Sequence, residues 1–119
     1  MTDDTEKVHL KEGRVFEYVV HAYYTIPTIE TGNDDSWKRI LGESCDLTKV
    51  AKIKITYENG EFVYINPART YDFTRTGDYT VEYGLYDYTN GLSNFLVSCK
   101  NLRYVQIDPS ITQCRSSFI

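Results

Sequence analysis

Residues 51–65 read AKIKITYENGEFVYI, and they carry the clearest structural signal in the chain. Apolar residues alternate with lysine and threonine over residues 51–56, as in a strand with one face in a core and the other in water. The dipeptide Asn59-Gly60 follows, and it is typical of a tight turn whose two central residues take positive φ. Residues 61–65 return as the partner strand, so the pattern predicts an antiparallel hairpin.

Segments on both sides of the hairpin also alternate between apolar and polar residues. Residues 14–24 carry apolar side chains on one face, with Glu17 and His21 on the other. Residues 79–87 alternate in the same way, and residues 71–74 and 102–107 are expected to be shorter strands. The alternation assigns these core candidates: Phe16, Tyr18, Ile53, Ile55, Tyr79, Val81 and Tyr83.

The pattern as a whole is that of an all-β protein. It gives roughly six or seven short strands about a dozen residues apart, which predicts a small antiparallel β-sandwich. A sandwich is expected because a single sheet would leave apolar rows uncovered, whereas two stacked sheets bury them. Ser36 is a candidate N-cap for one helical turn over residues 36–41, and residues 92–99 are expected to form another. An arm over residues 1–12, the sandwich over 13–107 and a tail over 108–119 make up the expected organisation.

Composition and charge argue against several classes of partner. The net charge is −4 at pH 7, and no run of lysine and arginine is interleaved with aromatic residues, so a nucleic-acid partner is not expected. No apolar run approaches the ~20 residues that span a bilayer, and residues 1–12 are polar and acidic, so neither a membrane span nor a signal peptide is expected. Cys45, Cys99 and Cys114 are an odd number without CxxC spacing, which indicates structural thiols rather than a disulfide framework.

The chain carries no motif of a known type of active site. His9 and His21 are the only imidazoles, and neither has a sequence neighbour that would make a metal pair or a catalytic base. The strings typical of phosphate, dinucleotide, hydrolase and zinc-protease sites are missing as well. We therefore expect no catalytic residue, no metal site, no cofactor and no enzymatic activity.

Tyrosine is unusually frequent, at 11 of 119 residues. Its ring has a large apolar face and a polar tip, which suits protein interfaces and sugar stacking. Tyr86 and Tyr88 point outward by parity and are candidate contact residues. The alternative is that the tyrosines only form strands and cover the sheet. Phe118 and Ile119 are apolar residues of the tail and further interface candidates.

The segment Gly77-Asp78-Tyr79-Thr80-Val81 resembles the late strand of immunoglobulin-like domains. In those domains a tyrosine lies two positions before the second disulfide cysteine, and Val81 stands at that cysteine position here. The resemblance implies an Ig-like sandwich. It also implies a tyrosine corner, in which the Tyr79 ring packs inside and its hydroxyl bonds to backbone upstream.

A longer run, residues 53–111, is similar to a module of surface and phage-associated proteins of gut bacteria. In that family a small β-domain leads into leucine-rich repeats of the BspA-like class. One repeat is matched here, by Phe95, Cys99, Leu102, Val105, Ile107, Pro109 and Ser110. Cys114 departs from the pattern, because such repeats usually have an apolar or small residue there. A lone repeat cannot bury its own face, so these residues either fold back on the sandwich as an edge element or form an arm that binds another subunit.

The resemblance, together with the expected lack of a signal peptide, implies a protein assembled inside the cell. The leading hypothesis is a non-enzymatic bacteriophage virion structural protein, a capsid decoration or auxiliary protein that docks on viral structural proteins of a capsid or tail. It would be assembled in the host cytoplasm and located in the virion. The alternative is a module on the surface of a gut bacterium that binds a carbohydrate or a protein, with a glycan as the possible ligand.

Overall fold

The structure is a computed structural model that describes residues 16–86 and 95–107. It confirms a small antiparallel all-β domain. The described elements are the strands β1 (Glu17–Ile26), β2 (Val50–Thr56), β3 (Phe62–Ile65), β4 (Gly77–Leu85) and β5 (Leu102–Ile107), with the 3-10 helices η1 (Ser36–Lys38) and η2 (Leu47–Lys49). The expected arm and tail, residues 1–12 and 108–119, lie outside the described residues.

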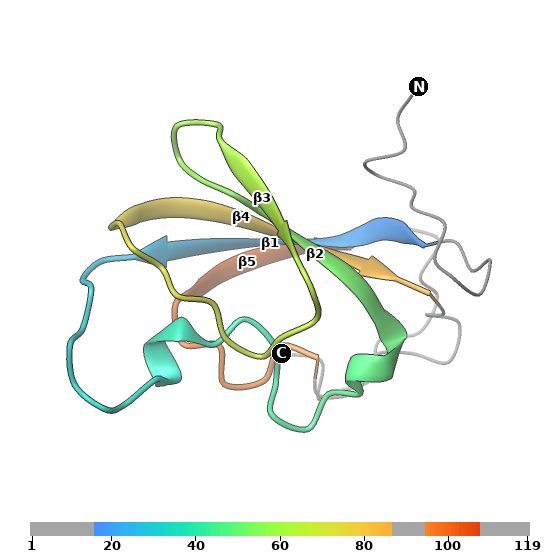
Figure 1. Cartoon of the computed structure of the whole chain (residues 1–119), viewed down its shortest axis with the longest axis horizontal. Coiled ribbons are helices and arrows are strands. Elements are labelled where there is room, and N and C mark those ends of the chain that lie inside the picture. The colour runs from blue at the N-terminus through green and yellow to red at the C-terminus, as the bar shows by residue number, and fades with distance from the viewer. Residues whose placement is uncertain (1–15, 87–94, 108–119) are drawn as a thin grey trace.

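The strands form one five-stranded sheet in the order β3-β2-β4-β1-β5. Every neighbouring pair is antiparallel. The long strands β1 and β4 therefore lie at the centre, and the short strands β3 and β5 form the two edges (Figure 1).

The predicted hairpin is confirmed, with β2 and β3 paired from Ile53–Ile65 to Thr56–Phe62. Its turn differs from the expected type, because Gly60 takes a φ of 96° whereas Asn59 is not among the described positive-φ residues. The Asn59 side chain instead accepts a hydrogen bond from the Glu61 backbone N–H at 3.0 Å. Backbone bonds from Tyr57 N–H to the Glu61 carbonyl at 2.7 Å and from Gly60 N–H to the Tyr57 carbonyl at 2.9 Å also close the turn.

A layer of coil takes the place that the predicted second sheet would occupy. The described residues contain a single sheet, and the loops that carry η1 and η2 run beneath it (Figure 1). These loops contribute large buried side chains, namely Trp37, Ile40, Leu41, Phe73, Phe95 and Leu96. The sandwich is therefore not found in this part of the chain, because apolar loop residues cover the core face.

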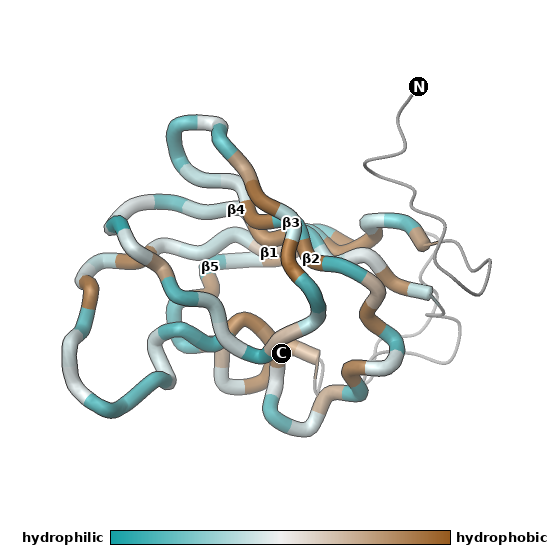
Figure 2. Tube along the Cα trace, in the orientation of Figure 1, coloured by the Kyte–Doolittle hydropathy of each residue, from teal (hydrophilic) through white to brown (hydrophobic). Residues whose placement is uncertain are grey.

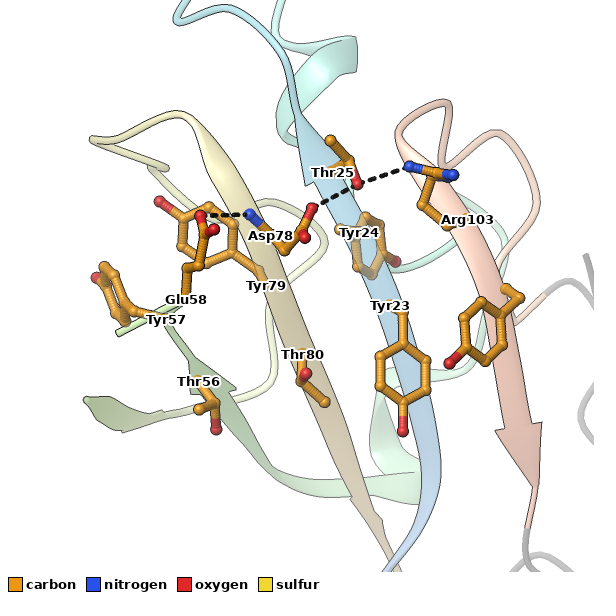
Figure 3. A pocket seen from close by; sticks show the side chains of 11 residues that line it. Tyr23, Tyr24, Thr25, Thr56, Tyr57, Glu58, Asp78, Tyr79, Thr80 and Arg103 are labelled. Carbon is orange, nitrogen blue, oxygen red and sulfur yellow. Dashed lines mark hydrogen bonds between the residues drawn. The ribbon is translucent and has the colours of Figure 1, made fainter. Parts of the chain in front are cut away.

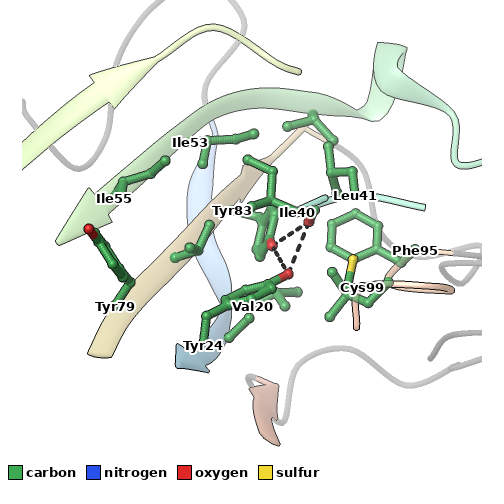
Figure 4. Close-up of a cluster of buried hydrophobic side chains, with 14 of the residues drawn as sticks. Val20, Tyr24, Ile40, Leu41, Ile53, Ile55, Tyr79, Tyr83, Phe95 and Cys99 are labelled. Atoms are coloured by element: carbon green, nitrogen blue, oxygen red, sulfur yellow. Dashed lines mark hydrogen bonds between the residues drawn. The ribbon is translucent and has the colours of Figure 1, made fainter. Parts of the chain in front are cut away.

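The core lies between this coil layer and one face of the sheet. Alternate residues of the strands supply it, including Ile53, Ile55, Val81 and Leu85, each at most 1% exposed. Tyr24 and Tyr83 are equally buried, and both hydroxyls bond to the backbone carbonyl of Ile40 (Figure 4). Their polar atoms are satisfied inside the core by the coil layer, so the layer and the sheet are joined by hydrogen bonds as well as by packing.

A β-bulge at Val19 changes which residues of β1 face the core. The register with β4 shifts between Tyr18 and Val20, so that Val19 and Val20 are both buried in the core. Phe16 is buried as predicted, whereas Tyr18 is only partly buried. Both lie on the face opposite the predicted one, because an extra residue reverses the alternation that precedes it. The Phe16 ring there covers Gly84, whose Cβ, if present, would lie 2.4 Å from the ring.

Three smaller predictions also need correction. Residues 71–74 form no strand, and only an isolated bridge joins Arg39 to Thr70. Ser36 does not cap η1; its backbone N–H donates to the Asp34 carboxylate at 2.9 Å. Residues 95–99 adopt turns instead of a helix, and the remainder of the expected turn over residues 92–99 lies outside the described residues.

The segment that resembles a repeat was expected either to fold back as an edge element or to form an arm that binds another subunit. For its residues up to 107, strand β5 decides between these alternatives. It pairs with β1 along the sheet edge, from Tyr24–Leu102 to Val20–Ile107. Phe95 and Cys99 are buried in the core. The segment therefore folds back as an edge element, while Pro109, Ser110 and Cys114 lie outside the described residues.

Hydropathy follows this architecture. Figure 2 shows apolar residues along the strands and hydrophilic residues along much of the loops between them. In the described part of the chain, no helix has the length and apolar character needed to cross a membrane.

Candidate functional site

The face of the sheet opposite the coil layer carries mostly polar and aromatic side chains. One row across the strands joins Phe62, Thr56, Thr80, Tyr23 and Tyr104 by their register. We call this surface the open face, because the core and the coil layer lie on the other side of the sheet.

Aromatic side chains cover one half of the open face. Phe16 packs edge-on against Tyr18 and Tyr86, with ring centroids 5.4 and 6.3 Å away. Tyr18 in turn contacts Tyr64 of β3 at 6.3 Å. These residues form a small cluster above Gly84, so this half of the face is filled by the chain's own rings.

The other half of the open face is hollowed into a groove of about 570 Å³ (Figure 3). The small side chains of Thr56 and Thr80 lie between larger ones in the same cross-strand row. Tyr23 and Tyr104 stand on the β1 and β5 side, and Glu58 stands on the side of the β2–β3 turn. The groove exists because two threonines separate the tyrosines from the turn.

Tyr23 and Tyr104 form a stacked pair on this side of the groove. Their ring centroids are 4.5 Å apart and their planes differ by 18°. The Tyr23 hydroxyl donates to Gln106 at 2.7 Å, which fixes the Tyr23 ring, while Tyr104 is 57% exposed. Burial raises the pKa of Tyr23, with Tyr104 and Glu82 adding to the effect, so its hydroxyl is neutral at physiological pH.

A line of hydrogen-bonded polar groups crosses β4, β1 and β5 at one end of the groove. Thr25 Oγ1 donates to Asp78 Oδ1 at 2.8 Å and accepts from Arg103 Nη1 at 3.0 Å (Figure 3). Arg103 reaches this position because β5 has one extra residue between the partners of Tyr23 and Tyr24. The bulge therefore brings a guanidinium to the groove.

Glu58 joins the same end of the groove from the β2–β3 turn. Its Oε1 accepts a hydrogen bond from the Asp78 backbone N–H at 3.2 Å. Gly77 makes room for it: a Cβ at Gly77, where φ is 127°, would lie 2.2 Å from Glu58 Oε1. Both carboxylates are exposed to water.

A search of protein-family models, curated proteins and solved structures finds no match to this chain. The site must be interpreted from its own residues.

The interface candidates from the sequence lie elsewhere or outside the described residues. Tyr86 packs against Phe16 in the aromatic cluster, away from the groove. Tyr88, Phe118 and Ile119 are not among the described residues. None of these four residues is brought into the groove by the described structure.

Sequence reasoning missed the residues that line the groove, although one signal was available. Tyr23 shares its parity with His21, which the alternation placed on the outward face of the first strand. Tyr104 and Arg103 gave no such signal, because their placement depends on the bulge in β5. The residues that line the groove come together through pairing between strands that are far apart in sequence.

The expected tyrosine corner is present. The Tyr79 hydroxyl donates to the backbone carbonyl of Arg75 at 2.6 Å, and its ring is buried. The bond ties the segment before β4 to the core, so Tyr79 has a structural role at the rim of the groove.

Among the described residues, the remaining cysteine and histidine side chains lie in the core or in an isolated pair. Cys45 and Cys99 are buried free thiols, and burial raises the pKa of both. His21 bonds Glu82 at 2.7 Å on the open face. Within residues 16–86 and 95–107, no group of three histidine, cysteine or acidic side chains is placed to hold a metal ion.

Proposed function

We propose that this protein is a non-enzymatic carbohydrate-binding domain, and that its ligand lies in the groove on the open face. One observation carries the proposal: the exposed, stacked tyrosine pair stands beside hydroxyl, carboxylate and guanidinium groups in a single groove. A sugar ring has an apolar face of C–H groups and a rim of hydroxyls, so it needs a flat aromatic surface together with directional polar groups.

The size of the groove supports a small ligand. Its volume of about 570 Å³ lies within the roughly 300–1,000 Å³ that small-molecule sites occupy. Apart from Tyr57 and Glu58 of the β2–β3 turn, the lining residues lie on strands, which hold side chains more rigidly than loops do. A short stretch of an oligosaccharide fits these dimensions.

The exposure of the two groove carboxylates supports binding rather than catalysis. A glycosidase uses one carboxyl group kept protonated by a shielded environment and a second that stays ionised. Glu58 and Asp78 are both exposed to water, so neither lies in such a shielded environment. Their carboxylate oxygens are placed to accept hydrogen bonds from the hydroxyls of a ligand.

The experiment is a glycan array probed with the wild-type chain and with Tyr104→Ala. We expect binding to bacterial or host polysaccharides that Tyr104→Ala reduces by about tenfold, since the loss of one aromatic contact costs on the order of 1 kcal/mol and about 1.4 kcal/mol is tenfold in affinity. Tyr86→Ala is the matched control, because it removes an open-face ring outside the groove. A blank array, or equal loss in both variants, contradicts the proposal.

A second candidate function is a bacteriophage virion structural protein, a capsid decoration protein docked on a capsid or tail. The edge strand β3 favours it: Phe62 and Val63 are 50% and 38% exposed at a sheet edge. An edge strand with exposed apolar residues can pair with a strand of a partner protein. Mass spectrometry of purified virions tests this candidate, and absence of the chain from the particles contradicts it.

A further inference from the structure

The charges around the groove are unequal. Glu58 and Asp78 both line it, whereas Arg103 is the single cationic side chain among the described residues that do. Arg103 also lies on the far side of Thr25 from Asp78, to which Thr25 is bonded. A ligand with its own carboxylate or sulfate would meet two like charges, and such contacts disfavour binding.

The polar line at the end of the groove is arranged before a ligand arrives. Thr25 holds Asp78 and Arg103 through its one hydroxyl, so acceptor and donor groups have fixed positions on neighbouring strands. Among the described residues, only Thr25 is hydrogen-bonded to the Arg103 guanidinium, which has five N–H donors. Adjacent hydroxyls of a sugar each donate and accept, so one suits the carboxylate and the next suits the guanidinium.

We infer that the groove selects neutral sugars: adjacent hydroxyls bind Asp78 and Arg103 while the ring stacks on Tyr104, and Glu58 excludes sugars that carry a carboxylate. The inference rests on the proposed function and assigns its ligand class. Glu58 and Asp78 then act as specificity-determining residues, Glu58 against acidic sugars and Asp78 for hydroxyl recognition.

The test compares neutral and acidic glycans of matched linkage, such as galactan with galacturonan and glucan with glucuronan oligosaccharides. The wild-type chain is expected to bind a neutral member at least about tenfold more tightly than its acidic counterpart. Glu58→Gln is expected to narrow the ratio of neutral to acidic affinity, because it strengthens binding of the acidic member. Asp78→Asn is expected to weaken the neutral ligand by about tenfold, because a charge-assisted hydrogen bond is lost.

Glu61→Gln is the matched control, because Glu61 lies in the same turn and does not line the groove. Glu61→Gln should leave the ratio of neutral to acidic affinity unchanged. High salt should narrow this ratio for the wild type, because ions screen exposed charges. If acidic and neutral glycans bind equally tightly and Tyr104→Ala weakens both, the inferred selectivity is wrong and the proposed function stands. If no glycan binds, the inferred selectivity and the proposed function are both wrong.

Discussion

Gly84 is a position where one missing methyl group decides the local packing. The Phe16 ring lies directly over it, and an added Cβ would be 2.4 Å from the ring and 3.3 Å from the Lys52 carbonyl oxygen. We expect Gly84→Ala to lower the free energy of unfolding by roughly 1–3 kcal/mol, because the buried ring must move. Urea denaturation measures the change.

Gly32→Ala provides the control, since nothing lies within 4 Å of its added Cβ. It should change stability by less than about 0.5 kcal/mol. Adding Phe16→Leu to Gly84→Ala should recover part of the loss, because a smaller side chain leaves room for the methyl group. Unchanged stability of Gly84→Ala would show that Phe16 does not occupy this position.

Cys99 predicts how stability depends on alkaline pH. Burial is the main cause that raises the pKa of its thiol from the ordinary value of 9.0 to about 11. The folded chain therefore holds this proton more tightly than the unfolded chain. The resulting stability is complete below pH 9 and is lost as the pH rises from 9 to 11.

Urea denaturation from neutral pH to pH 11 tests this dependence, and Cys99→Ala should flatten the loss that begins near pH 9. Burial also raises the pKa of Tyr24 and Tyr83 well above 10. The wild type and Cys99→Ala should therefore both lose stability at higher pH. An identical pH profile for Cys99→Ala and the wild type would rule out the thiol as the cause.

Among the connecting segments, Arg69 holds the coil layer together. Its guanidinium donates to the carbonyls of Glu43 and Cys45 at 2.8 and 2.9 Å, and its own carbonyl accepts from Ile40 N–H at 2.8 Å. Arg69→Lys keeps the charge but loses the planar donor geometry. We expect a loss of about 1–3 kcal/mol in the free energy of unfolding, together with faster amide exchange over residues 40–45.

Arg75→Lys is the control for the Arg69 variant. Arg75 is exposed and its guanidinium lies 3.7 Å from Glu61, a surface ion pair that contributes little. Equal stability of the Arg69 and Arg75 variants would mean that the coil layer is held by packing alone.

The strands could be predicted from the sequence where alternation was regular, and not where a bulge interrupted it. Residues 102–107 and the hairpin are found where they were expected. Phe16 and Tyr18 were placed on the wrong face because Val19, itself apolar, continues a run that looks regular. The groove depends on a second bulge, beside Arg103. The residues that line it could therefore not be predicted from local sequence patterns.

In the molecule as a whole, Trp37 reports on how the coil layer and the sheet unfold. It is the single tryptophan of the chain, it lies in η1, and it is 2% exposed in the shared core. We expect its fluorescence and the far-UV circular dichroism of the sheet to change at the same urea concentration, because one core joins both layers. A fluorescence transition at lower urea would show that the coil layer detaches first.

The number of layers could not be predicted from the periodicity. Alternation reports that one face of a strand is buried, but a sheet and a loop bury it equally well. Trp37, Ile40 and Leu41 were recognised as apolar residues of a turn, and their packing under the sheet depends on contacts with distant strands such as β4. The all-β class could therefore be predicted from the sequence, whereas the single sheet of the described residues could not.

The strand order also governs when this domain can assemble during translation. β1 leaves the ribosome first, yet both of its neighbours, β4 and β5, are synthesised after the β2–β3 hairpin. Among the described strands, only that hairpin can form from local sequence, so the apolar residues of β1 stay uncovered until β4 has been synthesised. Of the described strands, β1 is thus the one most vulnerable to aggregation during synthesis, which is where a holding chaperone would bind with the greatest benefit.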